Sequence, residues 1–279
     1  MRNRWIATLM LALAASLPGC SMDPFLYVPN RTAAYVFEPS SDEPEEVVAP
    51  GRIERVWIDV DAEIRLGAVL VRAEAQPPRG HVMYFHGAGT HLDAQFWRIK
   101  RMSNLGYDVF AVDYRGFGAS SDVQPTEEGI EADTRAARAW WLSQLPPGTG
   151  LVYYGHSFGG AVATQRAALD PPRAMILEAP FASVEHLRQD STGIGFPTSF
   201  IANDTWDTVA RIGQLQLPLL LAHGTADSLI RVEFGQAIFD AANEPKTLIL
   251  VEGGQHGDLL PRVQEDYRRF LEDVFEAAP

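Results

Sequence analysis

The chain has a single cysteine, Cys20, in 279 residues, and lysine is nearly absent. A lone cysteine excludes an internal disulfide bond. Basic residues number 23 against 36 acidic ones, which gives a formal net charge of −13. Because phosphate binding depends on clustered Lys and Arg, this balance argues against a nucleic-acid partner. The sequence also lacks a GxGxxG pattern, a P-loop and any His/Cys/Asp group with metal-ligand spacing, so we expect no cofactor and no metal.

Long hydrophobic runs are scarce, and the longest lies at the N-terminus. Arg2 and Arg4 precede an apolar stretch at 5–17 that is too short for a comfortable membrane span. This layout is typical of a secretory signal peptide, which we assign to residues 1–19. The whole chain is 46% hydrophobic and 21% charged, which is ordinary for a globular protein.

The leader ends in LPGC at 17–20, which resembles a bacterial lipobox. Cleavage at such a motif leaves Cys20 at the new N-terminus, where lipid chains are attached. Ser21 follows the cysteine, as in lipoproteins sorted to the outer membrane. We therefore expect a protein of the bacterial cell envelope that contacts the membrane through its lipid anchor only and faces the periplasm. The alternative is an ordinary signal peptide that ends near a cysteine.

After a tether at 20–51, residues 52–279 alternate apolar strand patterns with amphipathic helical patterns. Strands are expected at 53–60, 63–73, 81–85, 107–113, 151–154, 173–179, 217–224 and 246–253, and helices at 92–104, 126–145, 231–242 and 261–276. This alternation predicts an α/β fold with a mostly parallel, twisted sheet of about eight strands and helices on both faces. Residues 181–214 break the pattern and are interpreted as a short lid insertion.

The pentapeptide GHSFG at 155–159 follows the apolar run LVYY and precedes a small-residue helix. A G-x-S-x-G pattern in this context predicts a sharp, strained strand-to-helix turn that exposes the serine hydroxyl. Side chains at 155 and 159 would clash in such a turn, and both positions are glycine. Ser157 is therefore the candidate nucleophile.

A serine nucleophile requires a histidine to accept its proton and a carboxylate to orient that histidine. Asp227 and His256 each follow a later apolar strand, and the order Ser157, Asp227, His256 is that of the α/β-hydrolase arrangement. Glu178 and Asp204 compete with Asp227 for the role of the acid. His156, beside the serine, is expected to be structural.

Attack on an acyl carbon creates an oxyanion that backbone N–H groups must stabilise. The expected donors are Phe158, which follows the nucleophile, and Ala88, in the HGAGTH loop at 86–91 after a strand. A plain glycine turn is the alternative interpretation of this loop, and His86 is expected to support it.

The chain resembles α/β-hydrolases of the serine aminopeptidase S33 and BEM46-type group over roughly 55–275. The motifs that carry the resemblance are FHGAGTH (85–91), DYRGFGASS (113–121), EEGIEAD (127–133), GHSFGG (155–160), LEAPFAS (177–183), HGTAD (223–227) and GGQHGD (253–258). The resemblance implies a Ser157 nucleophile, an Asp227 acid and a His256 base. Substrates in this group include carboxylesters, thioesters, acylated proteins and peptides.

We therefore expect a serine hydrolase that cleaves a small-molecule acyl ester through an acyl-enzyme. A peptidase, an acyl-protein thioesterase and a non-catalytic envelope lipoprotein are the alternatives. Five aromatic residues are candidates for an acyl pocket or for the core: Phe85, Phe96, Phe196, Phe200 and Trp206. The sequence gives no indication of the oligomeric state.

Overall fold

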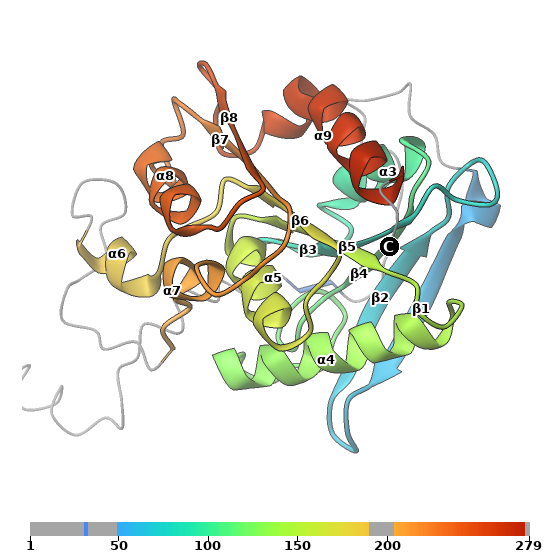
Figure 1. Ribbon diagram of the computed structural model, residues 1–279. Helices are drawn as coiled ribbons and strands as arrows, with labels where there is room; N and C mark the ends of the chain where they lie inside the picture. Colours follow the sequence, from blue (N-terminus) through green and yellow to red (C-terminus); the bar gives the residue numbers. More distant parts are fainter. Residues whose placement is uncertain (1–30, 33–48, 190–203, 277–279) are drawn as a thin grey trace, which may run out of the picture.

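The computed structural model describes residues 31–32, 49–189 and 204–276 and is built on an eight-stranded sheet (Figure 1). The strands are β1 (Ile53–Asp59), β2 (Arg65–Val71), β3 (His81–Phe85), β4 (Asp108–Val112), β5 (Leu151–His156), β6 (Ala174–Glu178), β7 (Leu219–Gly224) and β8 (Lys246–Val251). Their spatial order is β1-β2-β4-β3-β5-β6-β7-β8. The pairs β1–β2 and β2–β4 are antiparallel, and all others are parallel. The predicted α/β-hydrolase sheet is confirmed.

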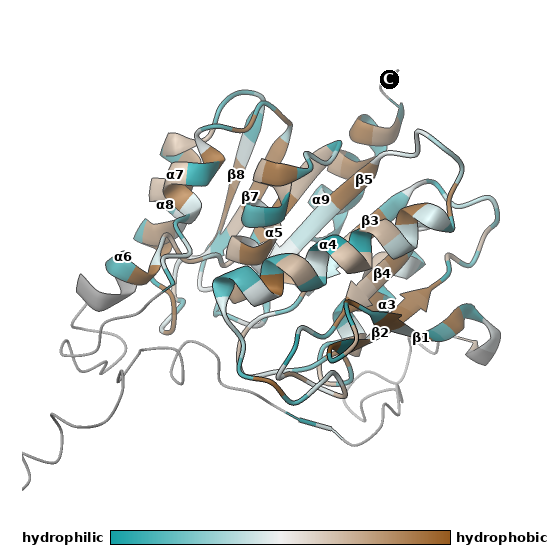
Figure 2. Cartoon of the chain, turned by 90° about the horizontal axis from the view of Figure 1, so that it is seen from below, coloured by the Kyte–Doolittle hydropathy of each residue, from teal (hydrophilic) through white to brown (hydrophobic). Residues whose placement is uncertain are grey.

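Helices cover both faces of this sheet (Figure 1). After the short 3-10 helix η1 (Pro50–Arg52) they are α3 (Phe96–Asn104), α4 (Glu127–Ser143), α5 (Phe158–Leu169), α6 (Val184–Gln189), α7 (Thr208–Ile212), α8 (Val232–Ala241) and α9 (Leu259–Glu276). One face is covered by α4, α5, α7 and α8, and the other by α3 and α9. In Figure 2, teal and brown residues alternate along α4, as expected for an amphipathic helix.

The two apolar cores arise from the alternation of side chains along each strand. Tyr153 of β5 packs into the core with α4 and α5, whereas its neighbour Tyr154 packs into the core with α3 and α9. Successive residues of a strand point to opposite faces, so a strand covered on both sides is apolar throughout. This explains why the buried strands are continuous apolar runs in the sequence.

The insertion predicted at 181–214 is described at its two ends only, and residues 190–203 lie outside the described chain. Glu127, the first residue of α4, binds the C-terminal end of the insertion. Its carboxylate accepts hydrogen bonds from the backbone N–H groups of Thr205 (2.8 Å) and Trp206 (3.1 Å) and pairs with Arg211. The end of the insertion is thereby attached beside the nucleophile helix α5.

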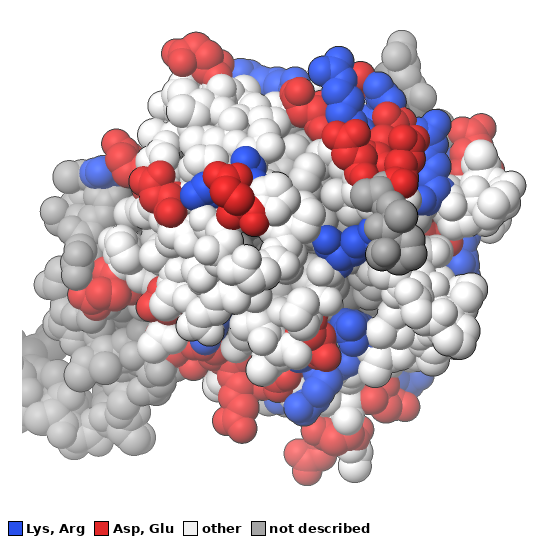
Figure 3. All heavy atoms as spheres, in the orientation of Figure 1, with Lys and Arg blue, Asp and Glu red and all other residues white. Residues whose placement is uncertain are grey.

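Charged residues of both signs lie together over α9 (Figure 3). Arg268 pairs there with Glu265 and Glu272, three and four residues away on the same helix. Exposed pairs of this spacing are screened by water and contribute little to stability. In the described ranges we find no helix with the length and apolar character needed to cross a membrane.

Candidate active site

Ser157 stands at the turn between β5 and α5. Its backbone has φ 55° and ψ −123°, a combination that a residue with a side chain rarely adopts. The turn is tied down by its own amide, which donates to the Glu178 carbonyl oxygen at 2.9 Å. The predicted strained strand-to-helix turn is therefore present, and it places the hydroxyl at the carboxyl edge of the sheet.

Both glycines that flank Ser157 are required by close backbone contacts. A Cβ on Gly155 would lie 2.4 Å from the carbonyl oxygen of Gly159, which is the clash predicted between these positions. A Cβ on Gly159 would lie 2.0 Å from the Phe85 carbonyl oxygen. The second glycine thus allows the start of α5 to approach the end of β3.

The structure brings Ser157, His256 and Asp227 into one chain of hydrogen bonds. The Oγ of Ser157 lies 2.9 Å from Nε2 of His256, and Nδ1 of His256 lies 2.8 Å from Oδ2 of Asp227. An ionised carboxylate only accepts hydrogen bonds, so Nδ1 carries a proton and Nε2 is left to accept from the serine. This is the tautomer that a histidine needs to act as a general base.

Asp227 is held as a buried anion. Its Oδ1 accepts from the amides of Leu229 and Ile230, both at 2.9 Å, and its side chain is fully buried. Burial by itself would raise the pKa of Asp227, but hydrogen bonds from His223 and His256 outweigh it and hold the pKa well below the usual range. The carboxylate is therefore charged and fixed against the ring of His256.

The two competing acids have other partners. Glu178, at the end of β6, pairs with Arg98 and accepts hydrogen bonds from Tyr154 (2.7 Å) and Tyr267 (3.0 Å). Asp204 accepts from the Glu127 amide at 3.0 Å. Of the three acids, Asp227 is the one with a hydrogen bond to His256.

The loop after β3 lies against the nucleophile. A Cβ on Gly87 would be 3.3 Å from Cβ of Ser157, so the backbone that leads to Ala88 runs beside the serine. His86 supports this loop, as expected: its buried ring stacks on Tyr114 at 4.3 Å and its Nδ1 lies 2.8 Å from the Gly87 carbonyl oxygen. Phe158 follows the serine as the first residue of α5, and its ring is buried.

Three of the five candidate pocket aromatics belong to the core. Phe85 and Trp206 are fully buried in one core, and Phe96 lies in the other with 4% exposure. The ring of Trp206 meets that of Phe158 edge to face, with centroids 4.9 Å apart. Phe196 and Phe200 lie outside the described residues, and so does Cys20.

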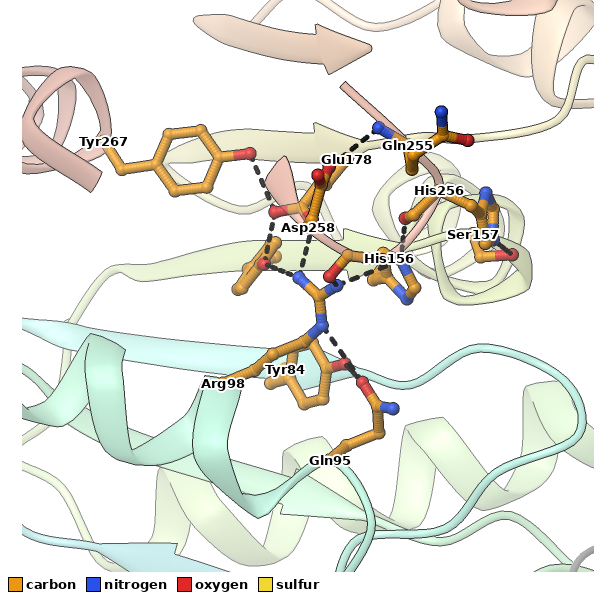
Figure 4. A network of polar contacts seen from close by, with 12 residues as sticks. Tyr84, Gln95, Arg98, His156, Ser157, Glu178, Gln255, His256, Asp258 and Tyr267 are labelled. Atoms are coloured by element: carbon orange, nitrogen blue, oxygen red, sulfur yellow. Dashed lines mark hydrogen bonds and ion pairs between the residues drawn. The ribbon is translucent and has the colours of Figure 1, made fainter. Parts of the chain in front are cut away.

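Sequence reasoning expected only a structural role for His156, and it missed Arg98 and His223, which contact the loop of His256 and the carboxylate of Asp227. Arg98 and His156 lie beneath the loop of His256 (Figure 4), and His223 lies 3.5 Å from Oδ2 of Asp227. His156 and His223 lie within the motifs GHSFGG and HGTAD, which was a usable signal. Arg98 stands in a helix with no motif, and nothing local marks it. Within the residues that the structure describes, no group of three His, Cys, Asp or Glu side chains is arranged to hold a metal ion.

Comparison with known proteins shows which proteins the chain is similar to. The profile of the family described as "Serine aminopeptidase, S33" matches residues 76–203. The protein YfhR of Escherichia coli K12 is 30% identical over 205 residues, which cover 71% of this chain and 70% of YfhR. Lysophosphatidylserine lipase ABHD12 of Danio rerio is 32% identical over 186 residues, 60% of this chain and 48% of that protein.

A Mycobacterium tuberculosis protein without an assigned function is 33% identical over 179 residues, and the match spans only 63% of its length. Among solved structures, Est1E of Butyrivibrio proteoclasticus with bound ferulic acid has a TM-score of 0.67 at 20% identity. It covers 79% of this chain and 99% of its own, which shows a common fold. Fold, profile and relatives agree that the chain belongs to the α/β-hydrolase superfamily.

Proposed function

We propose that the protein is a serine hydrolase that cleaves a carboxylic ester through an acyl-enzyme. The observation that carries the proposal is the Ser157–His256–Asp227 chain, with contacts of 2.9 Å between Ser157 and His256 and 2.8 Å between His256 and Asp227. A hydroxyl becomes an effective nucleophile when a neighbouring base accepts its proton during attack. The buried, charged Asp227 orients this base and stabilises its protonated form.

In the first half of the proposed reaction, Oγ of Ser157 attacks the carbonyl carbon while its proton passes to Nε2 of His256. The carbonyl oxygen becomes an oxyanion, which accepts hydrogen bonds from the backbone N–H groups of Phe158 and Ala88. Collapse of this intermediate breaks the ester C–O bond. His256 returns its proton to the departing alkoxide, and the acyl group remains on Ser157.

In the second half, a water molecule gives a proton to His256 and its oxygen attacks the acyl carbon. The second tetrahedral intermediate then releases the carboxylic acid, and Ser157 recovers its proton from His256. The named activity of the lipase relative and the ferulic acid bound to Est1E both support an ester as substrate. The S33 profile supports the alternative of a peptide bond.

The test is covalent labelling with a fluorophosphonate, followed by hydrolysis of p-nitrophenyl esters of increasing chain length and of an amino-acid p-nitroanilide. Labelling and ester turnover should both depend on Ser157, with Ser157→Ala lowering kcat by about 10⁴–10⁶. Ser183→Ala is a matched control, because its Oγ also contacts a histidine, His186 Nδ1 at 2.7 Å, without a positive φ.

Each outcome of this experiment decides between the candidates. Faster turnover of the anilide than of every ester would assign a peptidase. If neither wild type nor Ser183→Ala is labelled or active, a non-catalytic binding protein is the better description.

We further propose that the protein is anchored to the membrane through a lipid on Cys20. The Cys20→Ala variant should then be lost from the membrane fraction. Continued membrane association of this variant would contradict the lipobox assignment.

A further inference from the structure

A buried ion pair lies directly beneath the loop that carries His256 (Figure 4). Arg98 of α3 and Glu178 of β6 contact each other with side-chain exposures of 1% and 0%. Taking two charges out of water is expensive, and their attraction often fails to offset that expense. The presence of the buried Arg98–Glu178 pair is therefore not explained by a contribution to folding stability alone.

The pair is fully supplied with partners on the side away from the active site. Glu178 Oε2 accepts from the hydroxyls of Tyr154 and Tyr267. Nε of Arg98 donates to Oε1 of Gln95 at 3.1 Å. Burial lowers the pKa of Arg98, but the Glu178 carboxylate outweighs it and raises that pKa above its ordinary value. The guanidinium is therefore charged, planar and held in one orientation.

The remaining donor of this guanidinium reaches the catalytic loop. Nη2 of Arg98 donates to the carbonyl oxygen of Gly257 at 2.9 Å. His156 lies beside it, with Nε2 at 3.1 Å from the carbonyl oxygen of His256. Burial, then the charge of Arg98, lowers the pKa of His156 well below its usual value. The neutral ring donates its Nε2 proton to this carbonyl, because a carbonyl oxygen can only accept.

Two consecutive carbonyl groups, those of His256 and Gly257, are thus fixed from below. The other side of the loop is closed by Asp258, whose Oδ1 accepts from the Gln255 amide at 2.7 Å. With its backbone held at both sides, the His256 ring can direct Nε2 at Ser157 and Nδ1 at Asp227 at the same time. Loops that carry catalytic groups need such support, since a shift of about 1 Å can lower the rate roughly 100-fold.

We propose that Arg98, neutralised by Glu178, is a positioning residue that holds the His256 loop in its reactive geometry. This inference rests on the proposed function, because it assigns a role in the reaction at Ser157. The ion pair then has a role in catalysis that is distinct from any contribution to the stability of the fold. The carboxylate keeps the cation buried, and the cation holds the Gly257 carbonyl in place.

The test compares three variants in ester hydrolysis at saturating and at limiting substrate. Arg98→Lys keeps the charge next to Glu178, but an ammonium group lacks the planar fork that reaches Glu178, Gln95 and Gly257 together. Its kcat should fall about tenfold with KM within about twofold of wild type. The double variant Arg98→Met, Glu178→Gln removes both charges, and its kcat should fall about 100-fold.

Tyr267→Phe is the control for a purely structural role. It removes a 3.0 Å hydrogen bond to Glu178, and among the described residues the Tyr267 hydroxyl makes no hydrogen bond to the loop of His256. Its melting temperature should fall while its kcat stays at the wild-type value. If the double variant does not fold, the Arg98→Lys result decides alone.

Wild-type kcat in Arg98→Lys, or an equal loss of kcat in Tyr267→Phe, would overturn the positioning role. Failure of the proposed function is recognised separately, because the wild-type protein would then show no turnover that depends on Ser157. A loss of kcat in Arg98→Lys with unchanged KM and with the control fully active supports the inference.

Discussion

Gly159 leaves the least room for a side chain in the turn around the nucleophile. A Cβ there would lie 2.0 Å from the carbonyl oxygen of Phe85 and 2.7 Å from that of His86. Real Cβ atoms essentially never lie under 3.0 Å from such atoms. Gly159→Ala therefore has to move α5 away from the end of β3 by about 1 Å.

The expected magnitude follows from this displacement. Alanine in a helix interior is normally favoured over glycine by about 1 kcal/mol. Overpacking between two backbone segments costs about 1–3 kcal/mol and sometimes more. We therefore expect a net loss of up to about 2 kcal/mol in the free energy of unfolding. Because the Ala88 loop begins directly at Phe85, the same shift should lower kcat about 100-fold.

The assay is urea unfolding followed by far-ultraviolet circular dichroism, together with p-nitrophenyl ester turnover of the folded protein. Gly51→Ala is the control, because nothing lies within 4 Å of a Cβ at that position. Unfolding and turnover of this control should match the wild type. If Gly159→Ala also matches the wild type in both measurements, the close approach between α5 and β3 is not what requires the glycine.

Three further predictions concern the acid, the insertion and the pH dependence of stability. Asp227→Asn should lower kcat by about 10⁴ while leaving the circular dichroism spectrum unchanged, because an amide no longer selects the reactive tautomer of His256. Glu127→Gln should lower stability to urea by about 1–3 kcal/mol, because its single acceptor oxygen cannot serve both the Thr205 and Trp206 amides and the Arg211 guanidinium. Because the pKa of His156 is lowered in the folded state, the unfolded chain binds an extra proton below about pH 6.5. Stability should therefore fall on acidification, and His156→Gln should reduce the slope by up to about 1.4 kcal/mol per pH unit in urea titrations.

The strands and the position of Ser157 could be predicted because their signals are local. A strand covered on both faces is a continuous apolar run, and the turn after β5 requires glycine on both sides of the serine. Asp227 and His256 could be predicted because each directly follows a parallel strand after Ser157. The carboxyl ends of parallel strands lie at the same edge of the sheet, so these residues are brought near the serine.

The choice between Asp227 and Glu178 could not be made from local pattern, because both follow buried strands. It is decided by Arg98 and Tyr267, which lie 80 and 89 residues from Glu178 in the sequence. Arg98 also lies off the apolar side of a helix predicted from Phe96, Ile99 and Met102, where an arginine is normally solvated. Its burial depends on the loop of His256 passing over it, which only the tertiary fold determines.

The outermost strand β8 has a consequence for how the protein loses activity. It pairs with β7 alone, and most of its side chains are only half-buried or exposed. Strands at the edge of a sheet open more readily in native-state hydrogen exchange than central ones. His256 follows this edge strand, whereas Ser157 follows the central β5. Opening of β8 would therefore loosen the strand that leads into the loop of His256, while β5, which carries Ser157, stays paired on both sides.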